Sequence, residues 1–144
     1  MSVSDDDFVQ SEFRRAWQES QPGTTVPHEE GGFILRDLNG GLVVERWPRG
    51  VQNEISVPPH PGGRYGDLQV VATFHTHPNP GPNFQQEPSL TDIRAIRDDP
   101  ELSHAEYEGE YVIASEDLYR VCRNGDVEVV GSTRILLKLS QSLN

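Results

Sequence analysis

The chain has 144 residues, 34% of them hydrophobic and 24% charged, and this length suits one domain with one core. Its 12 basic and 23 acidic side chains give a net charge of −11. An acidic surface repels phosphate backbones and anionic lipids, so we expect no nucleic-acid or membrane partner. Cys122 is the only cysteine, which excludes an intrachain disulfide. The acidic N-terminus is unlike a signal peptide and no apolar segment is long enough to cross a bilayer, so we expect a cytoplasmic protein.

The N-terminal part of the chain predicts a helix followed by a β-hairpin. Ser4 is a suitable helix N-cap before three aspartates, and apolar residues then recur at helical spacing, so a helix is expected over residues 4–19. Two apolar runs, GGFILR and GLVVERW, flank the pair Asn39-Gly40. This pair is the strongest short-range signal for a hairpin, so each run is predicted to be a strand.

The middle of the chain predicts a buried strand, a loop and a second helix. A short strand is expected around residues 55–57, within a segment rich in proline and glycine. Residues 68–75, LQVVATFH, form a mostly apolar run with β-branched residues, which is typical of a buried strand. The segment 78–88 contains four prolines and a glycine and therefore predicts a loop. Ser89 then begins a helix as its cap, with Asp92 three residues later.

The C-terminal part predicts three more strands and a final helix. EYVIAS and LYRVC are predicted strands, and Asn124-Gly125 is a second hairpin signal that leads into VEVV. Residues 134–143 have helical spacing of their apolar side chains. This order of helices and strands predicts one α/β domain over residues 1–144, in which a mixed sheet is flanked by helices.

Two of the chain's five histidines, His75 and His77, are separated by one residue at the end of the predicted buried strand. In an extended strand such side chains share a face about 6.6 Å apart, so both can bind one metal ion. Ser89 and Asp92 share a face of the following helix. If the start of that helix folds over the end of the strand, Asp92 supplies a third ligand. Two imidazoles and one carboxylate leave a fourth tetrahedral position open, as in catalytic zinc sites.

Each of these features also has a structural explanation. A His-x-His pair is common in surface loops, and Ser89 with Asp92 could form only a capping box. Glu29 and Glu30 precede two glycines and an apolar strand, a pattern typical of exposed acids at a turn. His28 beside them is expected to be solvated. Alternatively, the two glycines could leave room for the backbone of a substrate.

Taken in order, four elements of the sequence resemble the JAMM motif of the JAB/MPN zinc metalloproteases. These elements are Glu29-x-x-Gly32 opening the apolar strand, His75-x-His77-Pro78, a gap of ten residues, and Ser89-x-x-Asp92. The resemblance extends over most of the chain and is closest to small prokaryotic JAB-type proteins. It implies a cytidine-deaminase-like, MPN-type α/β sandwich whose motif-bearing core spans residues 27–131.

The resemblance also implies a role for each residue of the motif. His75, His77 and Asp92 would bind Zn²⁺, Glu29 would be the general base, and Ser89 would donate a hydrogen bond to the transition state. The implied activity is that of a zinc-dependent isopeptidase or peptidase. Its expected substrate is an amide or isopeptide bond after the C-terminal tail of a ubiquitin-like or similar protein. The alternative is a JAB-like scaffold module that binds partners without catalysis, and the oligomeric state is left open.

Overall fold

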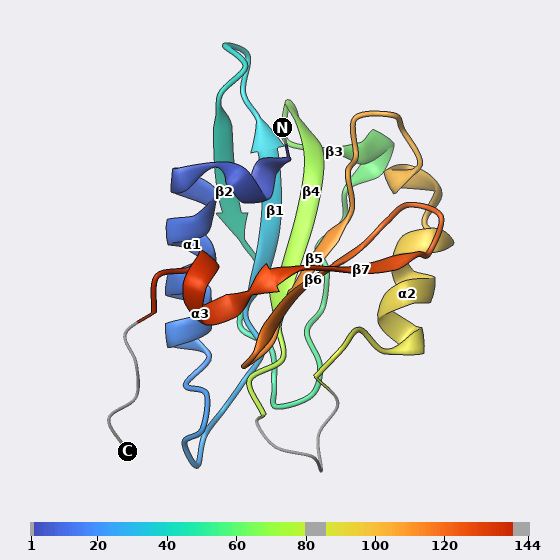
Figure 1. Cartoon of the computed structure of the whole chain (residues 1–144). Helices are drawn as coiled ribbons and strands as arrows, with labels where there is room; N and C mark the ends of the chain where they lie inside the picture. Colours follow the sequence, from blue (N-terminus) through green and yellow to red (C-terminus); the bar gives the residue numbers. More distant parts are fainter. Residues whose placement is uncertain (1, 80–85, 140–144) are drawn as a thin grey trace.

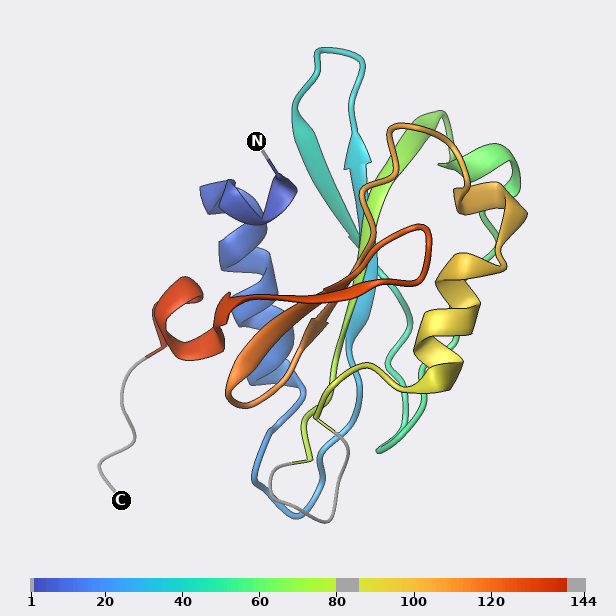
Figure 2. The same ribbon diagram turned by 45° about the vertical axis from the view of Figure 1, so that its right-hand side comes forward.

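The computed structural model of the protein describes residues 2–79 and 86–139. Seven strands form one mixed sheet in the order β2-β1-β4-β5-β6-β7, and β3 pairs with the start of β4. Helices α1 and α3 lie on one face of this sheet and α2 lies on the other (Figures 1 and 2). This arrangement confirms the predicted α/β class with a mixed sheet flanked by helices.

The main elements follow the predicted order, but three short 3-10 helices and the short strand β3 are added and the strand predicted at 55–57 is missing. In chain order they are η1 (Val3–Asp5), α1 (Asp7–Glu19), β1 (Gly31–Arg36), β2 (Leu42–Arg46), η2 (Pro61–Gly63), β3 (Arg64–Tyr65), β4 (Leu68–Thr76), α2 (Leu90–Arg97), η3 (Pro100–Leu102), β5 (Glu110–Ile113), β6 (Asp117–Val121), β7 (Val127–Ser132) and α3 (Thr133–Leu136).

The N-terminal helix begins three residues later than predicted. Asp6, not Ser4, is the cap of α1, and its Oδ1 accepts a hydrogen bond from the backbone N–H of Val9 at 3.1 Å. Ser4 lies instead in η1.

The strand expected at 55–57 is absent, and this segment has no regular structure. The two prolines that follow it have no N–H to donate to a neighbouring strand.

The C-terminal helix is much shorter than the predicted range of 134–143. α3 ends at Leu136, and Lys138 adopts a left-handed conformation with φ of 55°. The amides of Lys138 and Leu139 donate back to carbonyls inside the helix, which is the hydrogen-bond pattern of a Schellman motif. The helical spacing of the sequence therefore continues past the residue at which the helix stops. Residues 140–143 of the predicted range lie outside the described residues.

A register shift in the centre of the sheet determines which way the end of β4 faces. β1 and β4 are antiparallel, and the pairing shifts between Ile34 and Leu35, where β4 contains one extra residue. Side chains of a strand alternate between its faces, so Phe74 packs in the cluster under α1. His75 points the opposite way, toward Asp92 of α2.

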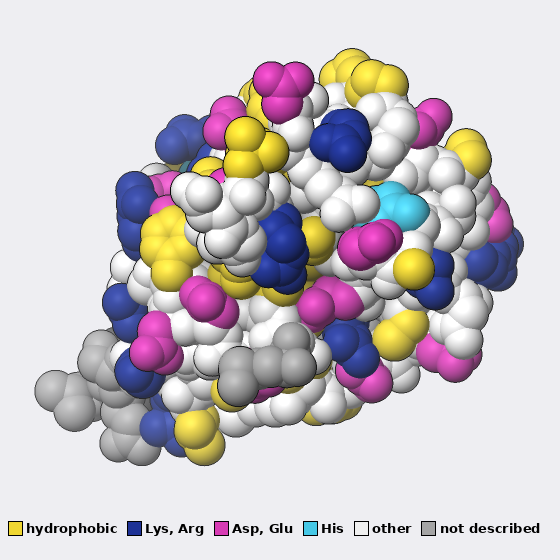
Figure 3. Space-filling model, turned by 90° about the horizontal axis from the view of Figure 1, so that it is seen from above, with side chains coloured by type: hydrophobic (Ala, Val, Ile, Leu, Met, Phe, Trp, Pro, Cys, Tyr) yellow, Lys and Arg dark blue, Asp and Glu magenta, His cyan; other side chains and the backbone are white. Residues whose placement is uncertain are grey.

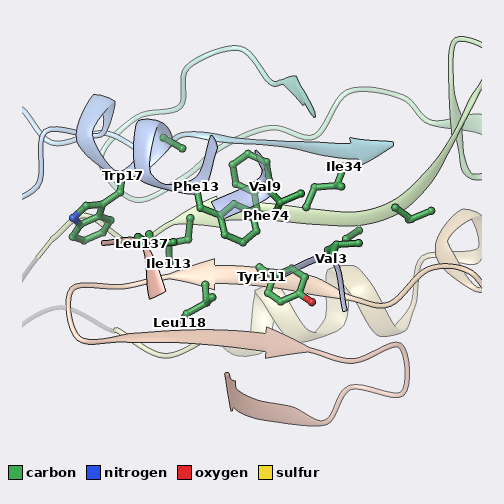
Figure 4. Close-up of a cluster of buried hydrophobic side chains, with 13 residues drawn as sticks. Val3, Val9, Phe13, Trp17, Ile34, Phe74, Tyr111, Ile113, Leu118 and Leu137 are labelled. Atoms are coloured by element: carbon green, nitrogen blue, oxygen red, sulfur yellow. The ribbon is translucent and has the colours of Figure 1, made fainter. Parts of the chain in front are cut away.

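The larger hydrophobic cluster lies between the sheet and α1 (Figure 4). Phe13 of α1 is fully buried, and its ring centroid lies 4.9 Å from that of Phe74 and 5.6 Å from that of Tyr111. Burying a side chain of this size contributes about 1.5–3 kcal/mol to folding. A second cluster on the other face includes Phe33 and Ile96 and attaches α2 to the sheet.

The negative charge of the protein is not gathered in one patch on the face that Figure 3 shows, where acidic and basic side chains are interspersed. Within the described ranges, no helix has the length and apolar character needed to cross a bilayer.

Candidate metal centre and active site

The end of β4 and the beginning of α2 lie at the same end of the molecule, at the bottom of Figures 1 and 2. The Nε2 atoms of His75 and His77 are 3.1 Å apart. Asp92 Oδ1 lies 3.5 Å from Nε2 of His75, and Oδ2 lies 3.3 Å from Nε2 of His77. The predicted convergence of these three side chains is therefore present, although His77 and Asp92 lie on either side of the proline-rich segment predicted to be a loop, of which residues 80–85 lie outside the described ranges.

The spacing of these atoms fits a metal ion. Zinc binds nitrogen and oxygen ligands at roughly 2.0–2.1 Å, and a tetrahedron with such bonds has edges of about 3.3 Å. The distance between the two Nε2 atoms and the distance from each of them to the nearer carboxylate oxygen of Asp92, Oδ1 for His75 and Oδ2 for His77, lie close to this value. The group formed by His75, His77 and Asp92 could hold a metal ion.

Each imidazole is oriented by a hydrogen bond at its other nitrogen. Nδ1 of His75 lies 2.6 Å from Oε2 of Glu110, and Nδ1 of His77 lies 3.0 Å from the backbone carbonyl oxygen of Gln86. Both partners accept hydrogen bonds, so each ring donates through Nδ1. Once deprotonated at Nε2, each ring would direct its Nε2 lone pair toward the shared centre, as is usual for histidines that bind metals.

Glu110 is a site residue that the sequence analysis did not identify. It opens β5, which pairs in parallel with β4 and places Glu110 opposite Thr73. Its side chain is buried, and Oε1 accepts a hydrogen bond from the Thr73 hydroxyl at 2.5 Å. The Thr73 hydroxyl also lies 2.6 Å from the hydroxyl of Tyr107. The only signal in the sequence was a carboxylate at the first position of an apolar strand.

Asp92 forms the helix cap that the sequence offered as one alternative, and it also faces the two imidazoles of the candidate metal centre. Its Oδ2 accepts a hydrogen bond from the backbone N–H of Ser89 at 2.8 Å, and its own backbone N–H donates to the Ser89 hydroxyl at 3.1 Å. This is a capping box, and the same carboxylate still contacts both imidazoles. Ser89 accepts through its hydroxyl oxygen, so its hydroxyl hydrogen remains available to another acceptor.

The charges of the centre are arranged to attract a cation. Burial alone would raise the pKa of Asp92, but the contacts with the two imidazoles outweigh burial and lower this pKa. Burial alone would lower the pKa of His75, yet the carboxylates of Glu110 and Asp92 raise it well above its usual value. A divalent cation would replace protons held between these groups, so metal binding would release protons.

Glu29 is brought beside the metal centre by the pairing of β1 with β4, which places Gly31 opposite His75. The Glu29 backbone is held by a hydrogen bond from its N–H to the carbonyl of Val51 at 2.8 Å. Its side chain is buried, and burial raises its pKa to about 7 against the opposing effect of the charges on His75 and His77. A carboxyl group with this pKa can both take and return a proton near neutral pH.

His28 and Glu30 are not solvated, contrary to expectation. Both are buried, and Nε2 of His28 lies 2.6 Å from Oε2 of Glu30. The other carboxylate oxygen of Glu30 accepts a hydrogen bond from Arg46 at 2.6 Å, and the Glu30 backbone N–H donates to the hydroxyl of Thr76. Glu30 therefore forms part of the folded framework beside Glu29.

The two glycines at the start of β1 are required by the packing of the chain itself. A Cβ on Gly31 would lie 2.5 Å from the carbonyl oxygen of Phe74 and 2.7 Å from the ring of Trp47. A Cβ on Gly32 would lie 2.7 Å from the carbonyl oxygen of Glu45. The hypothesis that these positions leave room for a substrate is therefore wrong, because protein atoms fill this space.

All five residues predicted for the site line one cavity of about 660 Å³. Glu29, Ser89 and the three candidate metal ligands line one end. The rest of the lining mixes six apolar side chains with polar ones, which include Asn53, Glu54, Thr91 and Asp99. The apolar part, called here the apolar half of the cavity, is formed by Trp47, Ile55, Val57, Ala95, Ile96 and Leu102.

Asn79 fixes the irregular segment that borders this cavity. Its side chain is buried, and its Oδ1 accepts a hydrogen bond from Nε2 of Gln52 at 3.0 Å. Its Nδ2 donates to the backbone carbonyl of Gln52 and to Oδ1 of Asn53. Asn79, which follows His77-Pro78, thus joins the segment after the two histidines to the segment that contains Gln52 and Asn53.

No protein-family model, no curated protein and no solved structure matches this chain.

Proposed function

We propose that this protein is a zinc-dependent JAMM-type isopeptidase or peptidase with an MPN-type fold. Its substrate would be an amide or isopeptide bond after the C-terminal tail of a ubiquitin-like or similar protein. The observation that carries this proposal is the convergence of His75, His77 and Asp92 in one cavity with the buried carboxyl of Glu29. A scaffold that only binds partners has no need for a base with a raised pKa beside a group that could hold a metal.

The proposed zinc site consists of Nε2 of His75, Nε2 of His77 and a carboxylate oxygen of Asp92. When bound, zinc would act as a Lewis acid that polarises a carbonyl and makes water acidic near neutral pH. Glu110 and the backbone carbonyl of Gln86 would hold the two imidazoles in the required tautomer.

Glu29 has the properties of a general base in this site. It lines the same cavity as the three candidate ligands, and its pKa of about 7 leaves a large fraction ionised at physiological pH. Its carboxylate would take the proton of the attacking water and return it to the leaving amine.

Ser89 would stabilise the negative charge that develops on the substrate carbonyl oxygen. The Ser89 hydroxyl accepts from the backbone N–H of Asp92, which restricts its position while leaving its hydrogen free to donate. A preorganised donor of this kind acts without reorganisation during the reaction.

The test compares zinc-loaded protein with Glu29→Gln on a panel of ubiquitin-like substrates, both tail-fused and lysine-linked. We expect the wild type to cleave at least one substrate and Glu29→Gln to keep its zinc but lose activity by about 100-fold or more. The matched control is Glu45→Gln, which makes the same change at an exposed position of β2 and should leave the rate unchanged.

Three results would contradict parts of the proposal. If Glu29→Gln cleaves at the wild-type rate, Glu29 is not the base. If the protein binds no stoichiometric zinc that a chelator can remove, the metal centre is wrong. If zinc binds but no substrate is cleaved, the scaffold alternative replaces the enzyme.

A further inference from the structure

We propose that the apolar half of the cavity binds a large apolar side chain that the substrate carries next to the scissile amide. This inference depends on the proposed function and makes it more specific. It predicts that the tail cleaved by this protein is not composed only of glycine around the cleaved bond.

One wall of this subsite belongs to the same helix as a candidate metal ligand. Ala95 and Ile96 follow Asp92 by three and four residues, so all three lie on one face of α2. One helical turn advances by about 5.4 Å, which is close to the distance between a backbone amide and the end of a neighbouring side chain. A substrate whose amide lies at the metal centre would thus place an adjacent side chain against this wall.

Another part of the apolar half comes from the irregular segment after β2. Ile55 and Val57 line the cavity from this segment, and the buried side chains of Trp47 and Leu102 complete the apolar lining. Val57 remains 45% exposed, which is high for an apolar side chain that lines a cavity. An apolar side chain of the substrate would cover this surface and remove it from water.

The segment that carries Ile55 is held in place before any ligand binds. The buried amide of Asn79 bonds to Gln52 and Asn53 at the start of the segment, and the backbone carbonyl of Val51 accepts from Glu29. Binding sites that are formed in advance cost little entropy on binding.

Two of the polar side chains that line the cavity, His60 and Asp99, bond to each other. Nδ1 of His60 lies 2.9 Å from the carbonyl oxygen of Pro58, and Nε2 lies 2.7 Å from Oδ2 of Asp99, so both ring nitrogens are occupied. His60 and Asp99 are therefore paired with each other rather than with a charged group of the substrate.

The cavity is large enough to hold a side chain of the substrate as well as its backbone. About 660 Å³ lies within the range of roughly 300–1,000 Å³ typical of sites for small molecules. A tail of two glycines would reach the metal centre but would leave the apolar half filled with water.

Binding can be measured without any cleavage. N-acetyl-leucinamide, N-acetyl-phenylalaninamide and N-acetylglycinamide would be titrated into zinc-loaded protein and followed by NMR at the indole N–H of Trp47. The chain has two tryptophans, so Trp17→Phe assigns the two indole signals. We expect the leucine and phenylalanine amides to bind about tenfold more tightly than the glycine amide and to shift the Trp47 signal.

A pair of variants on α2 tests the location. Ala95→Phe fills the subsite and should weaken binding of the leucine amide by about tenfold, with little effect on the glycine amide. Arg94→Phe introduces the same ring at an exposed neighbour that does not line the cavity, so it should leave binding unchanged. Equal binding of the leucine and glycine amides, or an Ala95→Phe variant that binds like the wild type, would overturn the inference.

Paired substrates that differ only by leucine or glycine next to the scissile bond link this subsite to the reaction. We expect kcat/KM to be about tenfold higher for the leucine substrate, and equal values would also overturn the inference. If nothing is cleaved while the apolar amides still bind and Ala95→Phe blocks them, the proposed function fails and the apolar subsite stands.

Discussion

Oε2 of Glu110 lies 2.6 Å from Nδ1 of His75, so a residue outside the sequence motif orients one of its histidines. The two residues come from neighbouring parallel strands, and both are buried. A buried carboxylate at this position also increases the negative charge around a bound cation.

Glu110→Gln is therefore expected to weaken zinc binding by about 10–100-fold, because glutamine retains the shape but not the charge. Competition with a chelator of known affinity measures this change. Glu116→Gln, an exposed acid close in sequence to β5, is the control and should bind zinc like the wild type. If Glu110→Gln binds zinc as tightly as the wild type, Glu110 does not support the metal centre.

Glu29 should destabilise the metal-free protein at alkaline pH. Its folded-state pKa is raised from 4.5 to about 7, so the folded state holds this proton more tightly than the unfolded state does. The associated stability is present below pH 4.5 and is lost as the pH rises through about 7. Without zinc, Glu29→Gln should raise the free energy of unfolding at about pH 8 by up to roughly 3 kcal/mol, and by little at about pH 4.5.

Urea unfolding of chelator-treated protein at these two pH values measures the effect. Glu45→Gln again serves as the control, since its side chain is exposed and should change stability little at either pH. A Glu29→Gln variant that is no more stable than the wild type at alkaline pH would show that burial of this carboxylate carries no cost.

The contact between His60 and Asp99 should stabilise the protein mainly at low pH. Burial alone would lower the pKa of His60, but hydrogen bonds to the Pro58 carbonyl and to Asp99 outweigh burial and raise it. A raised histidine pKa stabilises the fold below the unfolded-state value, and this contribution is lost as pH rises through the folded-state value. Asp99→Asn should lower the free energy of unfolding by about 1 kcal/mol near pH 5.5 and by much less near pH 9.

Thermal unfolding at both pH values measures this difference. Asp98→Asn is the matched control because Asp98 is exposed and bonds to Arg97 instead of a histidine. An effect of Asp99→Asn that is the same at both pH values would argue against a protonated His60.

Asn79 should hold the border of the cavity in place. Asn79→Ala removes the hydrogen bonds to Gln52 and Asn53 and should destabilise the protein by about 1–3 kcal/mol. Hydrogen exchange should become faster at the backbone amides of Val51 and Glu29, whose acceptors lie in or next to this segment. Asn39→Ala, in the exposed hairpin turn, should leave these amides unchanged.

Local patterns in the sequence predicted most of the elements, and the errors have local causes. The Asn39-Gly40 turn and the buried strand that ends at the histidines were correct because both depend on neighbouring residues. The C-terminal helix was predicted too long because the spacing of apolar residues does not reveal the left-handed conformation of Lys138, which ends the helix. The strand predicted at 55–57 was wrong because no neighbouring strand pairs with this segment, which runs into Pro58 and Pro59.

Part of the site was also predictable, because it depends on residues that are close together in the sequence. His75 lies in β4 and His77 just beyond its end, and Ser89 and Asp92 lie in the cap and first turn of α2, so their spacing alone places each pair together. Glu110 could not be found in this way, since it lies 35 residues from His75 and meets it only through the parallel pairing of β4 with β5.

The sequence by itself determined the class of fold, the local geometry of each pair of site residues, and the resemblance that suggests their chemistry. Only the tertiary structure decided that the pairs meet, that Glu29 is buried while Glu30 is bound to His28 and Arg46, and that an apolar half extends the cavity. The physical reason is that spacing along a strand or helix is set by covalent geometry and local hydrogen bonds. Burial, pKa and the shape of a cavity depend on residues that are distant in sequence and come together only when the chain packs.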